Sequence, residues 1–115
     1  ENKLPATKKK VNDAVDFIDS NYSRIDMSLN LVADTIGVNA SYLSNIFKKE
    51  KGCSLSKYLT QTRLEQAKKY LTEYPDKTLI EIAESIGYSD VYYFSKNFKK
   101  YYGISPSKYQ EERKM

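Results

Sequence analysis

The stretch from Ile82 to Lys100, IAESIGYSDVYYFSKNFKK, contains the clearest structural pattern in the chain. Apolar residues recur at helical spacing on both sides of Gly87, and glycine is suited to a sharp turn between two helices. The second periodic run follows Asp90. The stretch therefore predicts a short helix, a turn at Gly87 and a second helix that starts at Asp90, which is the arrangement of a helix-turn-helix.

The second helix of this stretch has two chemically different faces. Phe94, Phe98 and Tyr101 recur at positions i, i+4 and i+7, so we expect this face to be buried. Side chains on the other face can donate hydrogen bonds to base edges in a DNA major groove. Plain helical bundles also combine aromatic cores with polar surfaces, so the stretch alone leaves both interpretations open. The polar face consists of Tyr92, Ser95, Lys96 and Lys99.

The same unit occurs twice in the chain. The residues that lead to Gly37 match those that lead to Gly87 at an offset of 50. Beyond the turn the offset is 51, and nine of the 16 residues from Leu43 to Tyr58 are identical to their counterparts. Shared helix composition does not explain so many identities. The chain therefore contains a duplicated helix-turn-helix, and the turn of its second copy is one residue longer.

Composition and periodicity divide the chain into four segments. Residues 1–8 are expected to be a linker or tail, and residues 9–53 a first helix-turn-helix subdomain. Residues 54–74 predict a connecting helix followed by a turn, and residues 75–115 a second subdomain. The connecting helix would span roughly 28 Å, while one turn of B-DNA is about 34 Å, so the two units could reach successive major grooves.

Capping residues indicate where the individual helices begin and end. The first helix is expected from about Lys9 to Tyr22, and Gly37 is suited to the left-handed position that ends the second. Thr78 and Glu81 have the spacing of a capping box. The other expected N-caps are Ser28, Asn39, Ser54 or Ser56, and Ser105, which is followed by Pro106 at the first helical position.

The composition argues against several functional classes. The chain has no histidine and one cysteine, Cys53, so we expect no metal site and no His-dependent catalysis, and we expect a reducing compartment, the cytoplasm. Helix capping and solubility explain the neighbouring carboxylates of Glu81, Glu84 and Asp90, so we expect no enzyme activity and no cofactor. No apolar run approaches the roughly 20 residues of a membrane span. The net charge of +4 permits binding to a polyanion.

Four motifs in the second half of the chain carry a resemblance to a known family. They are RLEQAKKYL at residues 63–71, LIEIAESIGY at 79–88, YFSKNFKK at 93–100 and GISPSKY at 103–109. With these residues the chain resembles the DNA-binding domain of the AraC/XylS family of bacterial transcription regulators, over about residues 11–109. It is also similar to the output domains of two-component response regulators of this family.

The resemblance implies an all-α fold of about seven helices, with two helix-turn-helix subdomains joined by a long central helix. It implies sequence-specific binding to double-stranded promoter or operator DNA, with two recognition helices in adjacent major-groove segments, and control of transcription initiation. Contacts with RNA polymerase are also implied. Such domains are usually attached to a sensing or dimerisation domain, which we expect upstream of Glu1. We expect this fragment to be monomeric and the full-length chain to dimerise through that domain.

Carried over onto this sequence, the resemblance selects the polar faces of both recognition helices. Asn45 is suited to pair with adenine, Lys96 with guanine, and Val91 to pack on a thymine methyl group. The first recognition helix lacks arginine and tryptophan, so we expect it to bind weakly or to read DNA shape. The expected base contacts are Ala40, Ser41, Ser44, Asn45, Val91, Tyr92, Ser95 and Lys96. The expected backbone contacts are Asn39, Lys48, Ser89 and Lys99.

An alternative function is a helical protein-interaction module without sequence-specific DNA binding. The two functions differ in their response to salt, because contacts with DNA phosphates weaken steeply as the salt concentration rises. Binding to duplex DNA at low salt would favour the regulator, and its absence would favour the interaction module.

Overall fold

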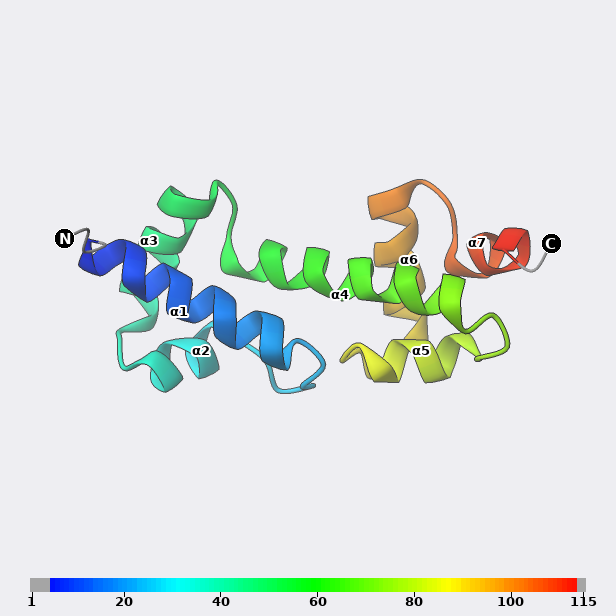
Figure 1. Ribbon diagram of the computed structural model, residues 1–115, viewed down its shortest axis with the longest axis horizontal. Helices are drawn as coiled ribbons and strands as arrows, with labels where there is room; N and C mark the ends of the chain where they lie inside the picture. Colours follow the sequence, from blue (N-terminus) through cyan, green and yellow to red (C-terminus); the bar gives the residue numbers. More distant parts are fainter. Residues whose placement is uncertain (1–4, 114–115) are drawn as a thin grey trace. The chain divides into compact units, whose positions relative to one another are not determined.

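The computed structural model describes residues 5–113, and these residues form seven α-helices and no strand (Figure 1). The expected all-α fold of about seven helices is therefore confirmed. The helices are α1 (Ala6–Asn21), α2 (Leu29–Ile36), α3 (Ala40–Lys51), α4 (Leu55–Glu73), α5 (Leu79–Ser85), α6 (Val91–Tyr102) and α7 (Pro106–Arg113).

The first helix begins earlier than its periodicity indicated. Of the expected tail at residues 1–8, residues 1–4 lie outside the described part, whereas Ala6 to Lys8 belong to α1. Pro5 stands at the N-cap position, and its carbonyl accepts a hydrogen bond from the amide of Lys9 at 3.0 Å. Proline lacks the amide hydrogen that a helix start leaves unpaired, so it is well placed there. Ala6 and Lys8 in this first turn are exposed, so the turn adds no apolar repeat to the pattern.

The chain divides into two compact units. The first unit comprises the described residues up to Tyr22 together with Asp26–Thr60, and the second comprises Ser23–Ile25 together with the described residues from Gln61 onward. The division falls inside α4, the helix predicted to connect the two subdomains. Its turns contribute apolar residues to both cores. Leu55 and Leu59 are buried in the first unit, and Leu64, Ala67 and Leu71 are buried further along the helix.

The core of the first unit is formed by α1, α2 and α3 with the start of α4. Val11, Ile18, Val32, Leu43 and Phe47 have almost no exposed surface. Within each helix the buried residues recur at helical spacing, so they share one inner face. Burial of this apolar surface fixes the rotation of each helix about its axis, and so determines which side chains of α3 face outward.

In the second unit α5 and α6 pack through Ile82, Ile86, Phe94 and Phe98, all fully buried. The expected third member of the aromatic stripe, Tyr101, is wrong, because its side chain is 41% exposed. Tyr102 takes this position, and its ring centroid lies 4.7 Å from that of Phe98. Tyr102 follows Phe98 by four residues, the spacing at which side chains stack on one side of a helix.

The capping residues lie where the sequence placed them. Ser28 and Asn39 accept hydrogen bonds from the first turns of α2 and α3, and Thr78 with Glu81 forms a complete capping box at α5. Ser54 and Ser105 accept hydrogen bonds from Lys57 and Lys108, one turn into α4 and α7. Gly37 ends α2 at φ +76°, a left-handed conformation that suits glycine because other residues are strained there. The cap residues and Gly37 therefore fix where the helices of the first helix-turn-helix begin and end.

Candidate nucleic-acid interface

The start of α6 is fixed by a side-chain cap. The Asp90 carboxylate accepts hydrogen bonds from the amides of Tyr92 at 2.9 Å and Tyr93 at 3.4 Å. Phe94 and Phe98 anchor the inner face of the helix. The cap fixes where α6 starts, and the core fixes its rotation about its axis. Together they determine which side chains of α6 face outward.

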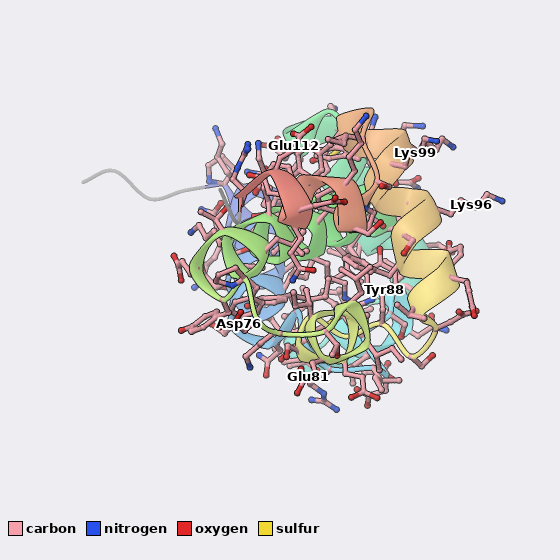
Figure 2. All side chains as sticks on the ribbon, turned by 90° about the vertical axis from the view of Figure 1, so that its right-hand side faces the viewer. Asp76, Glu81, Tyr88, Lys96, Lys99 and Glu112 are labelled. Carbon is pink, nitrogen blue, oxygen red and sulfur yellow. The ribbon has the colours of Figure 1, made fainter. Side chains whose placement is uncertain are left out.

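The outward face of α6 carries the residues that the sequence selected. Tyr92 is 83% exposed, Lys96 and Lys99 are exposed, and Val91 and Ser95 are half-buried. Figure 2 shows Lys96 and Lys99 extending from the outer side of α6, away from the core of the second unit. Tyr92, Ser95, Lys96 and Lys99 recur at i, i+3, i+4 and i+7, so they form one continuous stripe along the helix.

The corresponding face of α3 is built in the same way. The Asn39 side-chain oxygen accepts hydrogen bonds from the amides of Ser41 at 2.8 Å and Tyr42 at 3.2 Å. Leu43, Ile46 and Phe47 anchor the inner face of the helix. The remaining predicted contact residues lie on the other side, exposed at Ser41, Asn45 and Lys48 and half-buried at Ala40 and Ser44.

The two faces differ in reach and in charge. Tyr92 and Lys96 on α6 are long side chains with hydrogen-bonding groups at their tips, whereas Ser41 and Asn45 on α3 are short. The caps also differ, since Asn39 is neutral and Asp90 carries a negative charge. A carboxylate at a helix N-terminus competes with phosphate for the positive end of the helix dipole. A phosphate group would therefore meet less electrostatic repulsion at the N-terminus of α3 than at that of α6.

This difference changes the chemistry open to Ser89. The sequence suggested that Ser89 presents a helix N-terminus to phosphate, but the cap is Asp90, which already accepts from two amides of α6. Ser89 is exposed and precedes the cap. A contact with DNA at this position would therefore use the Ser89 hydroxyl and not the amides of the helix end.

A network of contacts supports the turn between α5 and α6, and the sequence did not predict it. Arg63 on α4 donates a hydrogen bond to the Arg24 carbonyl at 2.7 Å, and its guanidinium lies 5.6 Å from the centroid of the Tyr88 ring. Asn97 of α6 donates to the Tyr88 hydroxyl at 3.4 Å. Burial lowers the pKa of Arg63 and raises the pKa of Tyr88 from their ordinary values. The network ties the turn between α5 and α6 to α4.

The signal for this network was present in the spacing of α4. Arg63 falls four residues after Leu59 and four before Ala67, and both of these residues are buried. A cation in the middle of an apolar stripe needs partners within the fold, because a buried charge is costly unless it is hydrogen-bonded. An arginine at such a position therefore predicts a carbonyl or aromatic partner.

Residues 5–113 contain no group of three or more histidine, cysteine, aspartate or glutamate side chains that could hold a metal ion. None of the helices in this part of the chain is both long enough and apolar enough to cross a membrane. Cys53 is half-buried, with a free thiol.

Residues 32–112 match a family model described as a helix-turn-helix domain. The C-terminal domain of AraT, a response regulator from Geobacillus stearothermophilus, is 36% identical and superposes with a TM-score of 0.89, covering 95% of this chain and 89% of that one. The chain belongs to the AraC family of transcription regulators. AraC-family domains of this kind bind DNA through two helix-turn-helix units.

Two further AraC-family relatives are longer proteins. The Msm operon regulatory protein of Streptococcus mutans is 38% identical over 107 residues, and the lactose operon transcription activator of Staphylococcus xylosus is 40% identical over 101. These matches cover 93% and 87% of this chain but 38% and 35% of the relatives. The chain thus spans less than two fifths of these regulators. The DNA-binding domain of AdpA, solved with a target DNA, has the same fold at 17% identity, with a TM-score of 0.83.

Proposed function

We propose that this AraC-family domain reads a double-stranded operator with α3 and α6, each entering a segment of the major groove. The observation that supports the proposal is the repeated construction of these two helices. In both, a side-chain cap fixes the start and buried apolar residues fix the rotation, so that a polar stripe faces outward. An α-helix held in this way is the element that fits the B-DNA major groove.

The chemistry of the exposed stripes suggests individual roles. The amide of Asn45 can pair with the N6 and N7 positions of adenine, and the ammonium of Lys96 can donate to O6 and N7 of guanine. Ser41, Ser44 and Tyr92 offer hydroxyl groups that adapt to bases or phosphates. Val91 presents an apolar surface to a thymine methyl group. The small side chains of Ala40 on α3 and Ser95 on α6 allow each helix to approach the bases closely. Backbone contacts fall to Asn39, Lys48, Ser89 and Lys99.

The second unit supplies the larger share of base discrimination in this proposal. Lys96 and Tyr92 reach further from the helix axis than Ser41 and Asn45, and bidentate or long polar contacts separate one base from another. Among the short side chains of α3, Asn45 reads a base, and this unit otherwise reads groove width and holds the backbone, helped by the neutral cap at Asn39.

The activity of the full-length protein is also a proposal. Because the two operon regulators are longer than this chain and the similar AraT domain comes from a response regulator, we propose that a separate sensing or receiver domain supplies the signal and any dimer contact. This domain alone would then bind DNA as a monomer in the cytoplasm, and RNA polymerase would be its partner at the promoter.

Binding of this chain to duplex DNA across a range of salt concentrations tests the proposal. We expect fluorescence anisotropy to show binding that weakens steeply with salt, with a slope of about −0.9 for each phosphate contact. A selected sequence should bind more tightly than a scrambled duplex of equal length. Absence of binding in about 50 mM salt, where phosphate contacts are strongest, would refute the proposal.

A further inference from the structure

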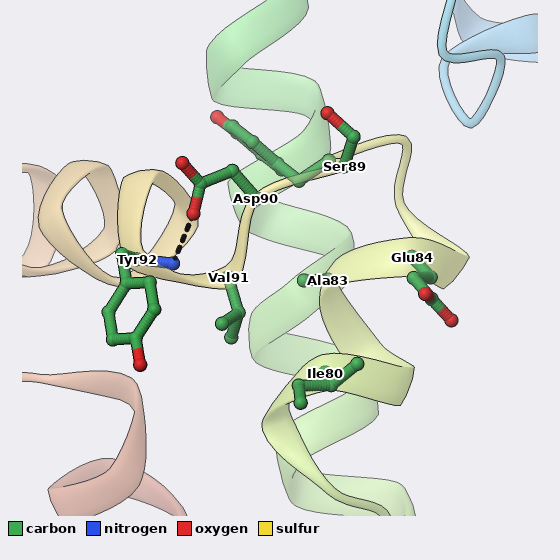
Figure 3. A pocket seen from close by; sticks show the side chains of 8 residues that line it. Ile80, Ala83, Glu84, Ser89, Asp90, Val91 and Tyr92 are labelled. Carbon is green, nitrogen blue, oxygen red and sulfur yellow. Dashed lines mark hydrogen bonds between the residues drawn. The ribbon is translucent and has the colours of Figure 1, made fainter.

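An apolar patch lies beside the start of α6 and is not needed for the core. Ile80 on α5 is 56% exposed, Tyr92 is 83% exposed and Val91 is half-buried. These three residues line a hollow of about 290 Å³ between α5 and the N-terminal turn of α6. Figure 3 shows Ile80 and Val91 extending into the same space, with the Tyr92 ring beside Val91.

The exposure of Ile80 follows from its position on α5. Ile82 and Ala83 form the buried side of this short helix. Ile80 lies about 160° around the helix axis from Ile82 and about 60° from Ala83, which places it at the margin of the buried side. A branched apolar side chain exposed next to an exposed aromatic ring leaves apolar surface in water, and such surface is stabilised when a partner covers it.

The charged residues around the hollow restrict which part of a DNA duplex could bind there. Asp90 and Glu84 also line it, and the Asp90 carboxylate is held in place by the amide of Tyr92. Two carboxylates disfavour a phosphate group at this point. Tyr92 belongs to the same stripe as Lys96 and Lys99, so the hollow is continuous with the face that would enter the major groove. A base edge therefore fits the hollow better than the DNA backbone does.

We propose that Ile80, with Val91 and Tyr92, binds the 5-methyl group of a thymine in the major groove. That methyl is the apolar group that the bases present on this edge of the duplex. The inference rests on the proposed function and extends it, because it makes Ile80 a specificity-determining residue although it lies on the helix before the recognition helix.

Replacement of thymine by uracil in the duplex tests this inference, because the two bases differ only by the methyl group. A binding site is first obtained by selection from a random duplex library, and each thymine is then replaced singly. For the wild-type chain we expect one thymine at which replacement weakens binding about fourfold, the ratio that corresponds to one buried methylene. Replacement at the other thymines should have smaller effects.

Protein variants link that thymine to Ile80. With Ile80→Ala the thymine-to-uracil affinity ratio at the sensitive position should fall toward one, whereas Ile80→Val should retain most of it. Ile25→Ala is the matched control, because Ile25 is also an isoleucine on the surface, 65% exposed, and does not line this hollow. Its ratio should equal that of the wild type. Thermal unfolding of each variant confirms that these exposed positions leave the fold intact.

The possible outcomes separate the two claims. If the wild-type chain selects no sequence, the proposed function fails and this inference fails with it. If it selects a site but no thymine is sensitive to loss of its methyl group, the proposed function stands and the inference is overturned. The inference is equally overturned if Ile80→Ala leaves the ratio at the sensitive thymine unchanged.

Discussion

Lys99 illustrates how position gives a common surface residue a specific role. It is exposed on the outward stripe of α6, one turn beyond Lys96 (Figure 2). Lys69 on α4 carries the same charge and is also exposed, but it lies on neither recognition helix. A lysine acts on a phosphate as a point charge and carries no base information, so its effect should be equal for all sequences.

Lys99→Ala should therefore weaken binding to every duplex and make the salt slope shallower by about 0.9, the value for one phosphate contact. Anisotropy titrations at several salt concentrations measure this slope for selected and scrambled duplexes. Lys69→Ala is the control and should keep the wild-type slope. A Lys99→Ala variant with an unchanged slope would show that Lys99 does not contact the backbone.

Arg63 is a single residue that stabilises the fold through contacts inside the second unit. Removal of its side chain in Arg63→Ala removes the hydrogen bond to the Arg24 carbonyl and uncovers the Tyr88 ring. We expect a loss of about 1.5–3 kcal/mol in the free energy of unfolding, the range for hydrogen bonds to charged groups. Urea denaturation measures it. Arg63→Lys should recover only part, because an ammonium lacks the planar fork of a guanidinium; equal stability of Arg63→Ala and wild type would contradict the account.

At the scale of the element, the caps determine where each recognition helix starts and what charge stands there. The neutral Asn39 and the acidic Asp90 make the same pair of hydrogen bonds to their helices. The chain thus contains its own comparison between the two caps. Asparagine and aspartate are about equally good N-caps, so exchange of one for the other changes charge with little change in helix stability.

Asp90→Asn should therefore raise the affinity for duplex DNA at low salt without loss of stability. Removal of a charge at a helix terminus corresponds to roughly a two- to fivefold change in affinity. Gel shift or anisotropy on selected and scrambled duplexes measures it, and thermal unfolding checks the fold. Lower affinity of Asp90→Asn would show that the carboxylate is itself a base contact and not a repulsive group.

The capping box of α5 predicts a pH dependence. The backbone and side-chain hydrogen bonds with Thr78 hold the pKa of Glu81 below its ordinary value of 4.5. A lowered pKa in the folded state stabilises the fold above the ordinary pKa, and this contribution is lost as the pH falls through the lowered value. The stability difference between wild type and Glu81→Gln should therefore shrink below about pH 4.5. Chemical denaturation at a series of pH values measures the difference, and a constant difference would count against the capping box.

At the scale of the whole molecule, helix positions and outward faces could be predicted because they depend on local chemistry. Serine, asparagine, threonine and glycine at helix ends act through neighbouring amides and carbonyls, so Ser28, Asn39, Thr78 and Gly37 could be identified without the fold. The duplication added the register of the second unit. The same local rules identified the stripes of α3 and α6 as exposed.

Features that depend on contacts between distant segments could not be predicted in this way. The choice of Tyr102 over Tyr101 depends on how α6 packs, and the pairing of Arg63 with Tyr88 joins residues 25 positions apart in the sequence. The division inside α4 depends on which core each of its turns enters. The exposure of Ile80 could not be predicted, because an apolar residue beside a buried stripe is ordinarily assigned to the core.

Selection from a random duplex library tests whether both α3 and α6 read bases. The wild-type chain should select two blocks of preferred bases. Asn45→Ala should lose the preference at one position of one block, and Lys96→Ala at one position of the other, while both variants keep the remaining preferences. A single selected block, or both variants losing preference within the same block, would contradict reading by two helices.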